Sequence, residues 1–270
     1  MTATVVLVGC GNMGGALLAG WLARGLSPDS IVVVEPDDGH AAAAAARGVC
    51  VVAAADALAS MPAPHVVVLA VKPQRLAEVL GGYAAFAGAG AVVLSIAAGR
   101  TIEALRSGLG DGTALVRAMP NTPASIGRGI SVACANEHTT GAQKARCDEL
   151  LAAVGSVLWV EDEALLDAVT AVSGSGPAYV FLLAECLARA GTQAGLPQAV
   201  AERLARETVA GAGELLARSP LSSMQLREAV TSPGGTTAAA LSVLGGDAGL
   251  QPLLSAAVEA AVRRSRELAG

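Results

Sequence analysis

Three glycines near the N-terminus have the spacing that holds phosphate groups against a protein backbone. Gly9, Gly11 and Gly14 form the pattern Gly-x-Gly-x-x-Gly between a β-branched apolar run and a helix-like stretch. The first glycine permits a tight turn, the second lets a pyrophosphate approach the main chain, and the third lets helix and strand pack closely. The N–H groups and the dipole of the following helix favour negative charge. The sequence therefore predicts a dinucleotide site, with a structural turn of another α/β fold as the alternative.

An acidic residue at the end of the second apolar run bears on which dinucleotide binds. Glu35 lies about 20 residues past Gly14, the separation at which an acid can hydrogen-bond the 2′-hydroxyl of the adenosine ribose. The first arginine that could meet a 2′-phosphate, Arg47, comes well after it. The pattern favours NADH over NADPH, whereas a Glu35 that merely ends a strand in solvent is the alternative.

A helix start that can bind an anion is predicted near the C-terminal end. Ser232 is a good N-cap, and Pro233 fits the first helical position. Gly234 and Gly235 would then lie in the first turn, where they are poor helix formers unless a ligand must approach the backbone closely. Thr237 places a hydroxyl beside this helix start. An ordinary capped helix with two loose glycines is the alternative.

The elements that would position these residues change in kind along the chain. Apolar runs alternate with helical stretches up to about residue 160, which predicts a doubly wound parallel sheet of the Rossmann type with ligands at the carboxyl ends of its strands. From residue 163 onward only helices are expected, the first over 164–172. The fold class is therefore α/β, with a dinucleotide-binding domain over 1–162 and an all-α domain over 163–270. The strands expected in the first domain are 4–8, 31–35, 49–53, 65–73, 91–99, 114–119, 130–135 and 157–160.

Composition limits the partners of the chain. Its 270 residues are 53% hydrophobic but only 2% aromatic, and the net charge of −5 without a basic stripe argues against nucleic acid. No uninterrupted apolar run reaches 18 residues and no basic segment precedes the first strand, so neither a membrane span nor a signal peptide is expected. The five scattered cysteines predict small buried side chains in a reducing cytoplasm, with no metal site. The later helices are apolar around most of their circumference, which favours burial against a second subunit.

Five motifs occur in order across nearly the whole chain: Gly9-Cys10-Gly11-Asn12-Met13-Gly14, Ala70-Val71-Lys72-Pro73, Met119-Pro120-Asn121-Thr122-Pro123, Ser173-Gly174-Ser175-Gly176-Pro177-Ala178-Tyr179 and Ser232-Pro233-Gly234-Gly235-Thr236-Thr237. Together they resemble the motifs of the pyrroline-5-carboxylate reductase family. The resemblance implies hydride transfer from NADPH or NADH to the C=N carbon of 1-pyrroline-5-carboxylate, the final step of proline biosynthesis. It also implies a homodimer made by the C-terminal helical domains, often assembled into larger rings.

The resemblance also assigns roles to individual positions. Thr237 would be the catalytic residue, orienting the imine or relaying a proton, because a threonine is a weak acid at neutral pH. The cofactor would meet the glycine loop, Glu35, Ala70, Val71, Lys72, Pro73, Ala97 and Asn121. The substrate would meet Glu163, Ser175, Gly176, Ser232, Gly234, Gly235, Thr236 and Thr237.

Two other functions compete with this one. β-Hydroxyacid dehydrogenases and imine-reductase-type oxidoreductases also have a Rossmann domain followed by helices. β-Hydroxyacid dehydrogenases, however, need a catalytic lysine in the helical part. The chain has only Lys72 and Lys144, and neither lies beyond residue 163. A non-catalytic NAD(P)-sensing module would have no use for the anion-ready helix start.

Overall fold

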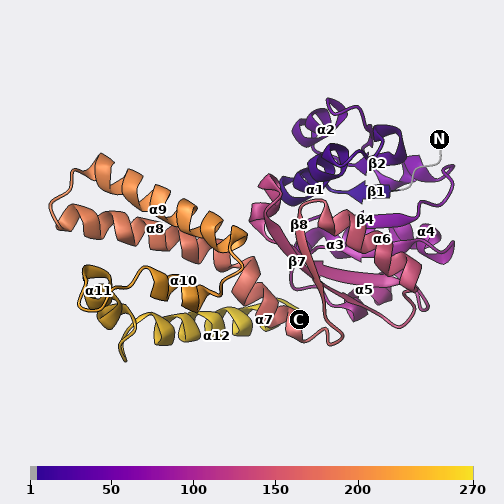
Figure 1. The fold of residues 1–270 in the computed structure, drawn as a ribbon. Coiled ribbons are helices and arrows are strands. Elements are labelled where there is room, and N and C mark those ends of the chain that lie inside the picture. Colours follow the sequence, from indigo (N-terminus) through magenta and orange to yellow (C-terminus); the bar gives the residue numbers. More distant parts are fainter. Residues whose placement is uncertain (1–4, 270) are drawn as a thin grey trace. The chain divides into compact units, whose positions relative to one another are not determined.

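The computed structural model describes residues 5–269 and confirms an α/β unit followed by helices (Figure 1). Thr4, expected in the first strand, lies outside the described residues. The sheet has eight strands in the order β3-β2-β1-β4-β5-β6-β7-β8. The strands are β1 (Val5–Val8), β2 (Ile31–Val34), β3 (Cys50–Val52), β4 (Val66–Leu69), β5 (Val92–Ser95), β6 (Leu115–Met119), β7 (Gly129–Ala135) and β8 (Gly155–Trp159).

Helices cover both faces of this sheet, because its central strands are apolar on both sides. Val5 and Leu7 of β1 belong to one buried cluster, and Val6 and Val8 belong to another. Alternate residues of a strand point to opposite faces, so each face needs its own helical layer. The helices are α1 (Asn12–Ala23), α2 (Asp38–Ala45), α3 (Leu76–Val79), α4 (Ala84–Gly88), α5 (Ile102–Leu109) and α6 (Gly141–Ala152), joined by the short turns η1 (Pro28–Ser30), η2 (Ala55–Leu58), η3 (Pro73–Arg75), η4 (Leu80–Tyr83) and η5 (Thr122–Ile126).

The last two strands, β7 and β8, depart from the parallel sheet that the sequence predicts. β7 pairs antiparallel with β6, so that Val116 lies opposite Ala135 and Met119 opposite Val132. The two strands are joined by residues 120–128, a short segment that contains η5 and a left-handed Gly127 (φ +70°). A parallel pair needs a crossover of about a dozen residues or more, and this connection is too short for one. β8 then returns parallel to β7 after the crossover helix α6.

Beyond β8 the described residues form helices and turns, as expected. The predicted helix 164–172 is instead a short α-helix, α7 (Leu165–Val169), followed by a π-helical stretch, η6 (Thr170–Gly174). The remaining helices are α8 (Gly176–Gln193), α9 (Gln198–Arg218), α10 (Ser223–Ala229), α11 (Thr236–Leu244) and α12 (Leu250–Ala269).

The chain divides into two compact units. The first, called here the sheet unit, contains the chain up to Gly174 and also its end from Val262, and the second, the helical unit, contains Ser175–Ala261. This division is based on contacts between residues. The predicted domain boundary between residues 162 and 163 is based on the change from alternating strands and helices to helices alone, and it stays a prediction. Helix α12 therefore starts in the helical unit and ends in the sheet unit.

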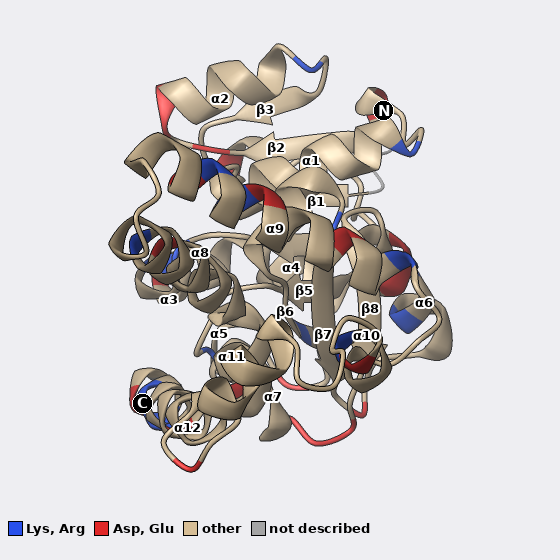
Figure 2. Ribbon diagram, turned by 60° about the vertical axis from the view of Figure 1, so that its left-hand side comes forward, with Lys and Arg blue, Asp and Glu red and all other residues tan. Residues whose placement is uncertain are grey.

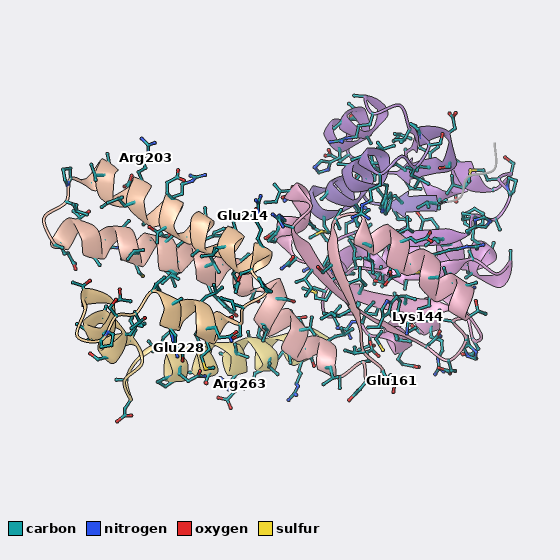
Figure 3. The ribbon with its side chains drawn as sticks, in the orientation of Figure 1. Lys144, Glu161, Arg203, Glu214, Glu228 and Arg263 are labelled. Atoms are coloured by element: carbon teal, nitrogen blue, oxygen red, sulfur yellow. The ribbon has the colours of Figure 1, made fainter. Side chains whose placement is uncertain are left out.

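The helical unit exposes many large apolar side chains. Phe181 of α8 is 64% exposed, Leu253 of α12 is 65% exposed and Val243 of α11 is 74% exposed. Charged side chains such as Arg203 on α9 extend into solvent (Figure 3). Among the described residues, one continuous helical stretch, Leu165–Gln193, is long and apolar enough by length and composition to cross a membrane. Exposed apolar faces of this extent on the described residues agree with the expected burial against a second subunit.

The expectation that all cysteines are buried is wrong for two of them. Cys10, Cys134 and Cys147 are buried, but Cys50 and Cys186 are exposed. Burial raises the pKa of the Cys147 thiol to about 12, so this group stays protonated at neutral pH. Cys50 lies at the start of the outermost strand β3, and Cys186 lies on the exposed surface of α8, which explains why both escape the core.

Candidate active site

The glycine loop has the geometry that a dinucleotide requires. Gly9 has φ +88°, and its N–H donates to the Val34 carbonyl at 2.9 Å. A Cβ on Gly14 would lie 2.2 Å from the Gly9 oxygen, so no larger residue fits there. A Cβ on Gly11, in contrast, would meet only the His40 ring, at 4.0 Å. The backbone at Gly11 is therefore open to a ligand at the N-terminus of α1, which fits a pyrophosphate.

Glu35 lies beside this loop and also holds it in place. Its carboxylate accepts the Cys10 N–H at 2.6 Å and the Asp37 N–H at 3.0 Å. The residue is 8% exposed. Each carboxylate oxygen has a second lone pair, so the side chain can accept a further hydrogen bond from a ribose hydroxyl. The ribose contact stays a prediction, and Glu35 also has a structural role at the glycine loop that the sequence did not indicate.

The other predicted cofactor residues follow the neighbouring strands at the same edge. Val8, Leu69 and Ser95 are register partners at the ends of β1, β4 and β5. The segments that come directly after these residues therefore meet at the carboxyl edge of the sheet. These segments contain Gly9–Gly14, Ala70, Val71, Lys72, Pro73 and Ala97.

The side-chain amide of Asn121, also expected at the cofactor, is hydrogen-bonded to backbone groups of the protein. Its Nδ2 donates to the Ser173 carbonyl at 3.2 Å, and its Oδ1 accepts the Ile130 N–H at 2.9 Å. The residue is 9% exposed. Asn121 therefore ties the turn after β6 to β7 and to the π-helical stretch.

Glu163 and the buried Arg117 form an ion pair that sequence reasoning missed. Glu163 Oε1 accepts a hydrogen bond from Arg117 Nη1 at 2.8 Å and another from the N–H of Ile102, the first residue of α5, at 2.8 Å. The Arg117 side chain is 7% exposed and that of Glu163 is 27% exposed. The one available signal was a charged residue in the middle of the apolar strand β6. This carboxylate therefore braces α5, β6 and the chain before α7 against one another.

The helix start at 232–237 differs in detail from the prediction. Ser232 is not the N-cap, because Gly235 occupies that position and α11 begins at Thr236. The Gly235 N–H donates to the Ser232 carbonyl at 3.0 Å, and Gly234 has φ +71°. Proline followed by a positive-φ glycine is the pattern of a type II turn, which uses the same residues that suggested a capped helix. The first N–H groups of α11 still lack helical partners, so an anion can bind there.

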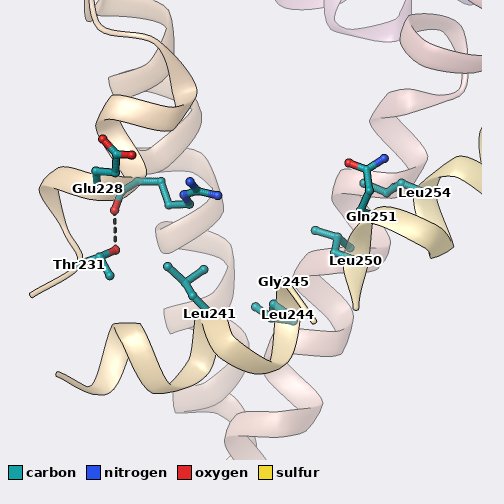
Figure 4. Close-up of a pocket in the computed structure, with 9 residues that line it drawn as sticks. Glu228, Thr231, Leu241, Leu244, Gly245, Leu250, Gln251 and Leu254 are labelled. Atoms are coloured by element: carbon teal, nitrogen blue, oxygen red, sulfur yellow. Dashed lines mark hydrogen bonds between the residues drawn. The ribbon is translucent and has the colours of Figure 1, made fainter. Parts of the chain in front are cut away.

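The remaining predicted substrate residues also belong to the helical unit. Ser175 precedes α8, and Gly176, its first residue, faces open space. Thr237 lies in the first turn of α11 and is half-buried. A cavity of about 460 Å³ lies in this unit, lined in part by Arg227, Glu228 and Leu241 (Figure 4). At its wall the Thr231 hydroxyl donates to the Arg227 carbonyl at 2.6 Å. The dinucleotide edge therefore belongs to the sheet unit, and the anion-ready turn belongs to the helical unit.

A dinucleotide-binding sheet unit followed by an apolar helical unit defines a two-domain NAD(P)-dependent oxidoreductase. Two family models match the chain: residues 4–99 match the model described as NADP oxidoreductase, coenzyme F420-dependent, and residues 163–268 match pyrroline-5-carboxylate reductase dimerisation. The pyrroline-5-carboxylate reductase of Pseudomonas aeruginosa is 40% identical over 99% of this chain and 97% of its own length. The enzyme of that name from Synechocystis is 41% identical over 99% of each chain. The chain belongs to the pyrroline-5-carboxylate reductase family.

Solved structures agree with this membership. A pyrroline-5-carboxylate reductase from Coxiella burnetii superposes with a TM-score of 0.92 at 36% identity, and the match covers 100% of both chains. A pyrroline carboxylate reductase from Plasmodium falciparum, solved with NADP bound, gives a TM-score of 0.82 at 27% identity and covers 99% of this chain and 98% of its own. The expected family, fold class and enzyme class are confirmed. The dimerisation match also identifies the exposed apolar helices as those of a homodimer.

Proposed function

We propose that this chain reduces 1-pyrroline-5-carboxylate to L-proline, the last step of proline biosynthesis. The observation that carries the proposal is the anion-ready turn at Ser232–Gly235, which precedes α11 inside the segment that matches the family's dimerisation model. The substrate carries one carboxylate and one C=N bond. The free N–H groups of α11 suit the carboxylate, and the Thr237 hydroxyl follows within the same turn.

The reaction needs a hydride donor, a proton and two aligned partners. A bound reduced nicotinamide supplies the hydride, which adds to the C=N carbon while the ring nitrogen gains a proton and becomes a secondary amine. Thr237 orients the imine nitrogen or relays a proton from water to it, since its hydroxyl is too weak an acid to act alone. Most of the rate is expected to come from holding the hydride donor and the C=N carbon together at van der Waals contact.

The proposed site contains the residues that the resemblance assigned. Glu163 stays a proposed substrate residue and Asn121 a proposed cofactor residue. Both also hold neighbouring elements together through the contacts described above. The cofactor set is Gly9, Cys10, Gly11, Asn12, Met13, Gly14, Glu35, Ala70, Val71, Lys72, Pro73, Ala97 and Asn121. The substrate set is Glu163, Ser175, Gly176, Ser232, Gly234, Gly235, Thr236 and Thr237, with Thr237 as the catalytic residue.

A steady-state assay with 1-pyrroline-5-carboxylate and each reduced nicotinamide tests the proposal. Turnover to proline is expected. Oxidation of β-hydroxyacids without imine reduction would favour the dehydrogenase alternative. NADH binding without turnover of any cyclic imine would favour a sensor.

The proposed cofactor preference is for NADH. Asp37 and Asp38 join Glu35 at the start of α2, which is acidic (Figure 2). Three carboxylates there would repel a 2′-phosphate, whereas Glu35 can accept a hydrogen bond from a 2′-hydroxyl. The Asp37 carboxylate accepts the His40 N–H, and this bond holds the pKa of Asp37 below its usual value, so its charge persists at neutral pH. A ratio of kcat/KM values for NADH and NADPH measures the preference directly.

The proposed assembly is a ring of homodimers in the cytoplasm. Support comes from the extent of apolar surface on α8, α11 and α12, which exceeds what scattered surface residues normally expose. Light scattering at several protein concentrations distinguishes a dimer from a larger ring.

A further inference from the structure

The end of the last helix is fastened to α7 by one carboxylate. The Ser265 hydroxyl donates to Asp167 Oδ1 at 2.7 Å, and Arg266 Nε lies 3.6 Å from Asp167 Oδ2. Ser265 is only 5% exposed, and the Asp167 side chain is 18% exposed. These three residues are called here the Asp167 latch. All of them lie in the sheet unit, although α12 begins in the helical unit.

Helix α7, which contains Asp167, is itself packed against the sheet. Its Leu166 is fully buried in a cluster with Val132 of β7 and Cys134 of the same strand. Just before α7, Glu163 accepts the N–H of Ile102 at the start of α5. Asp167 therefore projects from an element that is fixed to the sheet by apolar packing and to α5 by a hydrogen bond.

Beyond the latch, α12 reaches the turn between β5 and α5. A Cβ placed on Gly99 would lie 3.4 Å from the Leu268 Cβ and 3.5 Å from the Leu268 carbonyl oxygen. Gly99 has φ +69°, so this turn has a conformation that other residues rarely adopt. The same turn contains Ala97, which follows β5 at the carboxyl edge of the sheet. The last residues of the chain thus lie against a turn of the predicted cofactor site.

We infer that the Asp167 latch positions the turn at 97–101 for the nicotinamide half of the cofactor. This inference rests on the proposed function, which includes Ala97 among the cofactor-binding residues; the family resemblance implies that Ala97 lies near the nicotinamide ribose. Asp167 and Ser265 are then positioning residues, because they act through Leu268 and the turn and not on the reacting atoms. Most of α12 belongs to the segment that matches the dimerisation model, so the turn is held by a helix that the dimerisation domain supplies.

Ser265→Ala tests the latch with little risk to the fold, since it removes one hydroxyl. The amides of residues 97–102 should exchange hydrogen several-fold faster than in the unaltered protein, measured without any cofactor. The Kd for NADH, from binding titrations, and the KM for NADH should both rise about 3- to 10-fold, the size of effect expected from losing one ordinary hydrogen bond. The kcat at saturating NADH should change less than twofold. Ser265→Thr keeps a hydroxyl and should restore exchange and KM.

Glu267→Ala is the matched control on the same helix. Glu267 pairs with Arg264 at 2.8 Å, and both side chains are more than half exposed. If Ser265→Ala and Glu267→Ala give the same exchange rates and the same KM, the latch has no positioning role. If the exchange difference appears but the unaltered protein never reduces 1-pyrroline-5-carboxylate, the proposed function fails while the latch holds the turn. If reduction proceeds and exchange is unchanged, the latch fails and the proposed function stands.

Discussion

Removing the carboxylate of Glu163 tests whether it is a structural brace or a substrate ligand. Glu163→Ala leaves the almost buried Arg117 without its partner and the Ile102 N–H without an acceptor. Breaking a fully buried pair costs about 3–5 kcal/mol. Glu163 is 27% exposed, so water replaces part of the lost interaction. Adding the lost hydrogen bond to Ile102 gives an expected loss of about 3 kcal/mol in the free energy of unfolding.

Glu163→Gln separates charge from hydrogen bonding. The glutamine oxygen can still accept from Arg117 and Ile102, so only the charge is lost, and a cost of about 1 kcal/mol is expected. Urea unfolding at fixed protein concentration measures both variants through tryptophan fluorescence. The chain has two tryptophans, Trp21 and Trp159, and both lie in the sheet unit that contains the pair.

Glu161→Ala is the control, because this nearby glutamate is exposed (Figure 3). Equal unfolding midpoints for Glu161→Ala and Glu163→Ala would refute the brace. A second result would also refute it: Glu163→Gln with unaltered stability but a KM for 1-pyrroline-5-carboxylate raised more than tenfold, at constant KM for NADH. That outcome would make Glu163 a substrate ligand, as the family resemblance implies.

Four further outcomes are expected. Gly14→Ala should abolish NADH binding in calorimetry, because the added Cβ would lie 2.2 Å from the Gly9 carbonyl oxygen. The control Gly15→Ala, whose Cβ has its nearest contact at 3.5 Å, should bind NADH normally. Equal affinities of the two variants would contradict the loop geometry. Thr237→Val should lower kcat by about 10- to 100-fold, and an unchanged kcat would remove the hydroxyl from the mechanism. Glu35→Ser should weaken the binding of both NADH and NADPH, since the Cys10 N–H loses its acceptor. It should also raise kcat/KM for NADPH relative to kcat/KM for NADH. An unchanged ratio of the two kcat/KM values would show that the Glu35 charge does not select the cofactor. Phe181→Glu should dissociate the dimer in light scattering because it charges the exposed apolar face of α8, and an intact dimer would place the interface elsewhere.

The sequence predicts local chemistry better than long-range pairing. The glycine loop was recognisable because strand, turn and helix follow one another within a few residues. The pair of Arg117 and Glu163 joins positions 46 residues apart, and no local pattern connects them. A charged residue inside the apolar strand β6 implies a buried partner in general, but it does not identify that partner.

Two errors arose where one set of residues suits two conformations. Pro233 fits the first position of a helix and also the second position of a type II turn, and Gly234 with φ +71° decides for the turn. The apolar run of β7 likewise suits a parallel or an antiparallel strand. The short connection after Met119 decides its direction, and only the structure gives the exact bounds of that connection.

The return of the chain end to the sheet unit has a consequence for protein synthesis. Asp167 and Ser265 are 98 residues apart, so Ser265 leaves the ribosome only after the whole helical unit has been synthesised. Domains usually fold as they emerge, N-terminal first. Here the sheet unit can begin folding first but is completed last, and the helical unit must fold as an insertion tethered to it at both ends. A stop codon shortly before Val262 would therefore damage the domain that was made first.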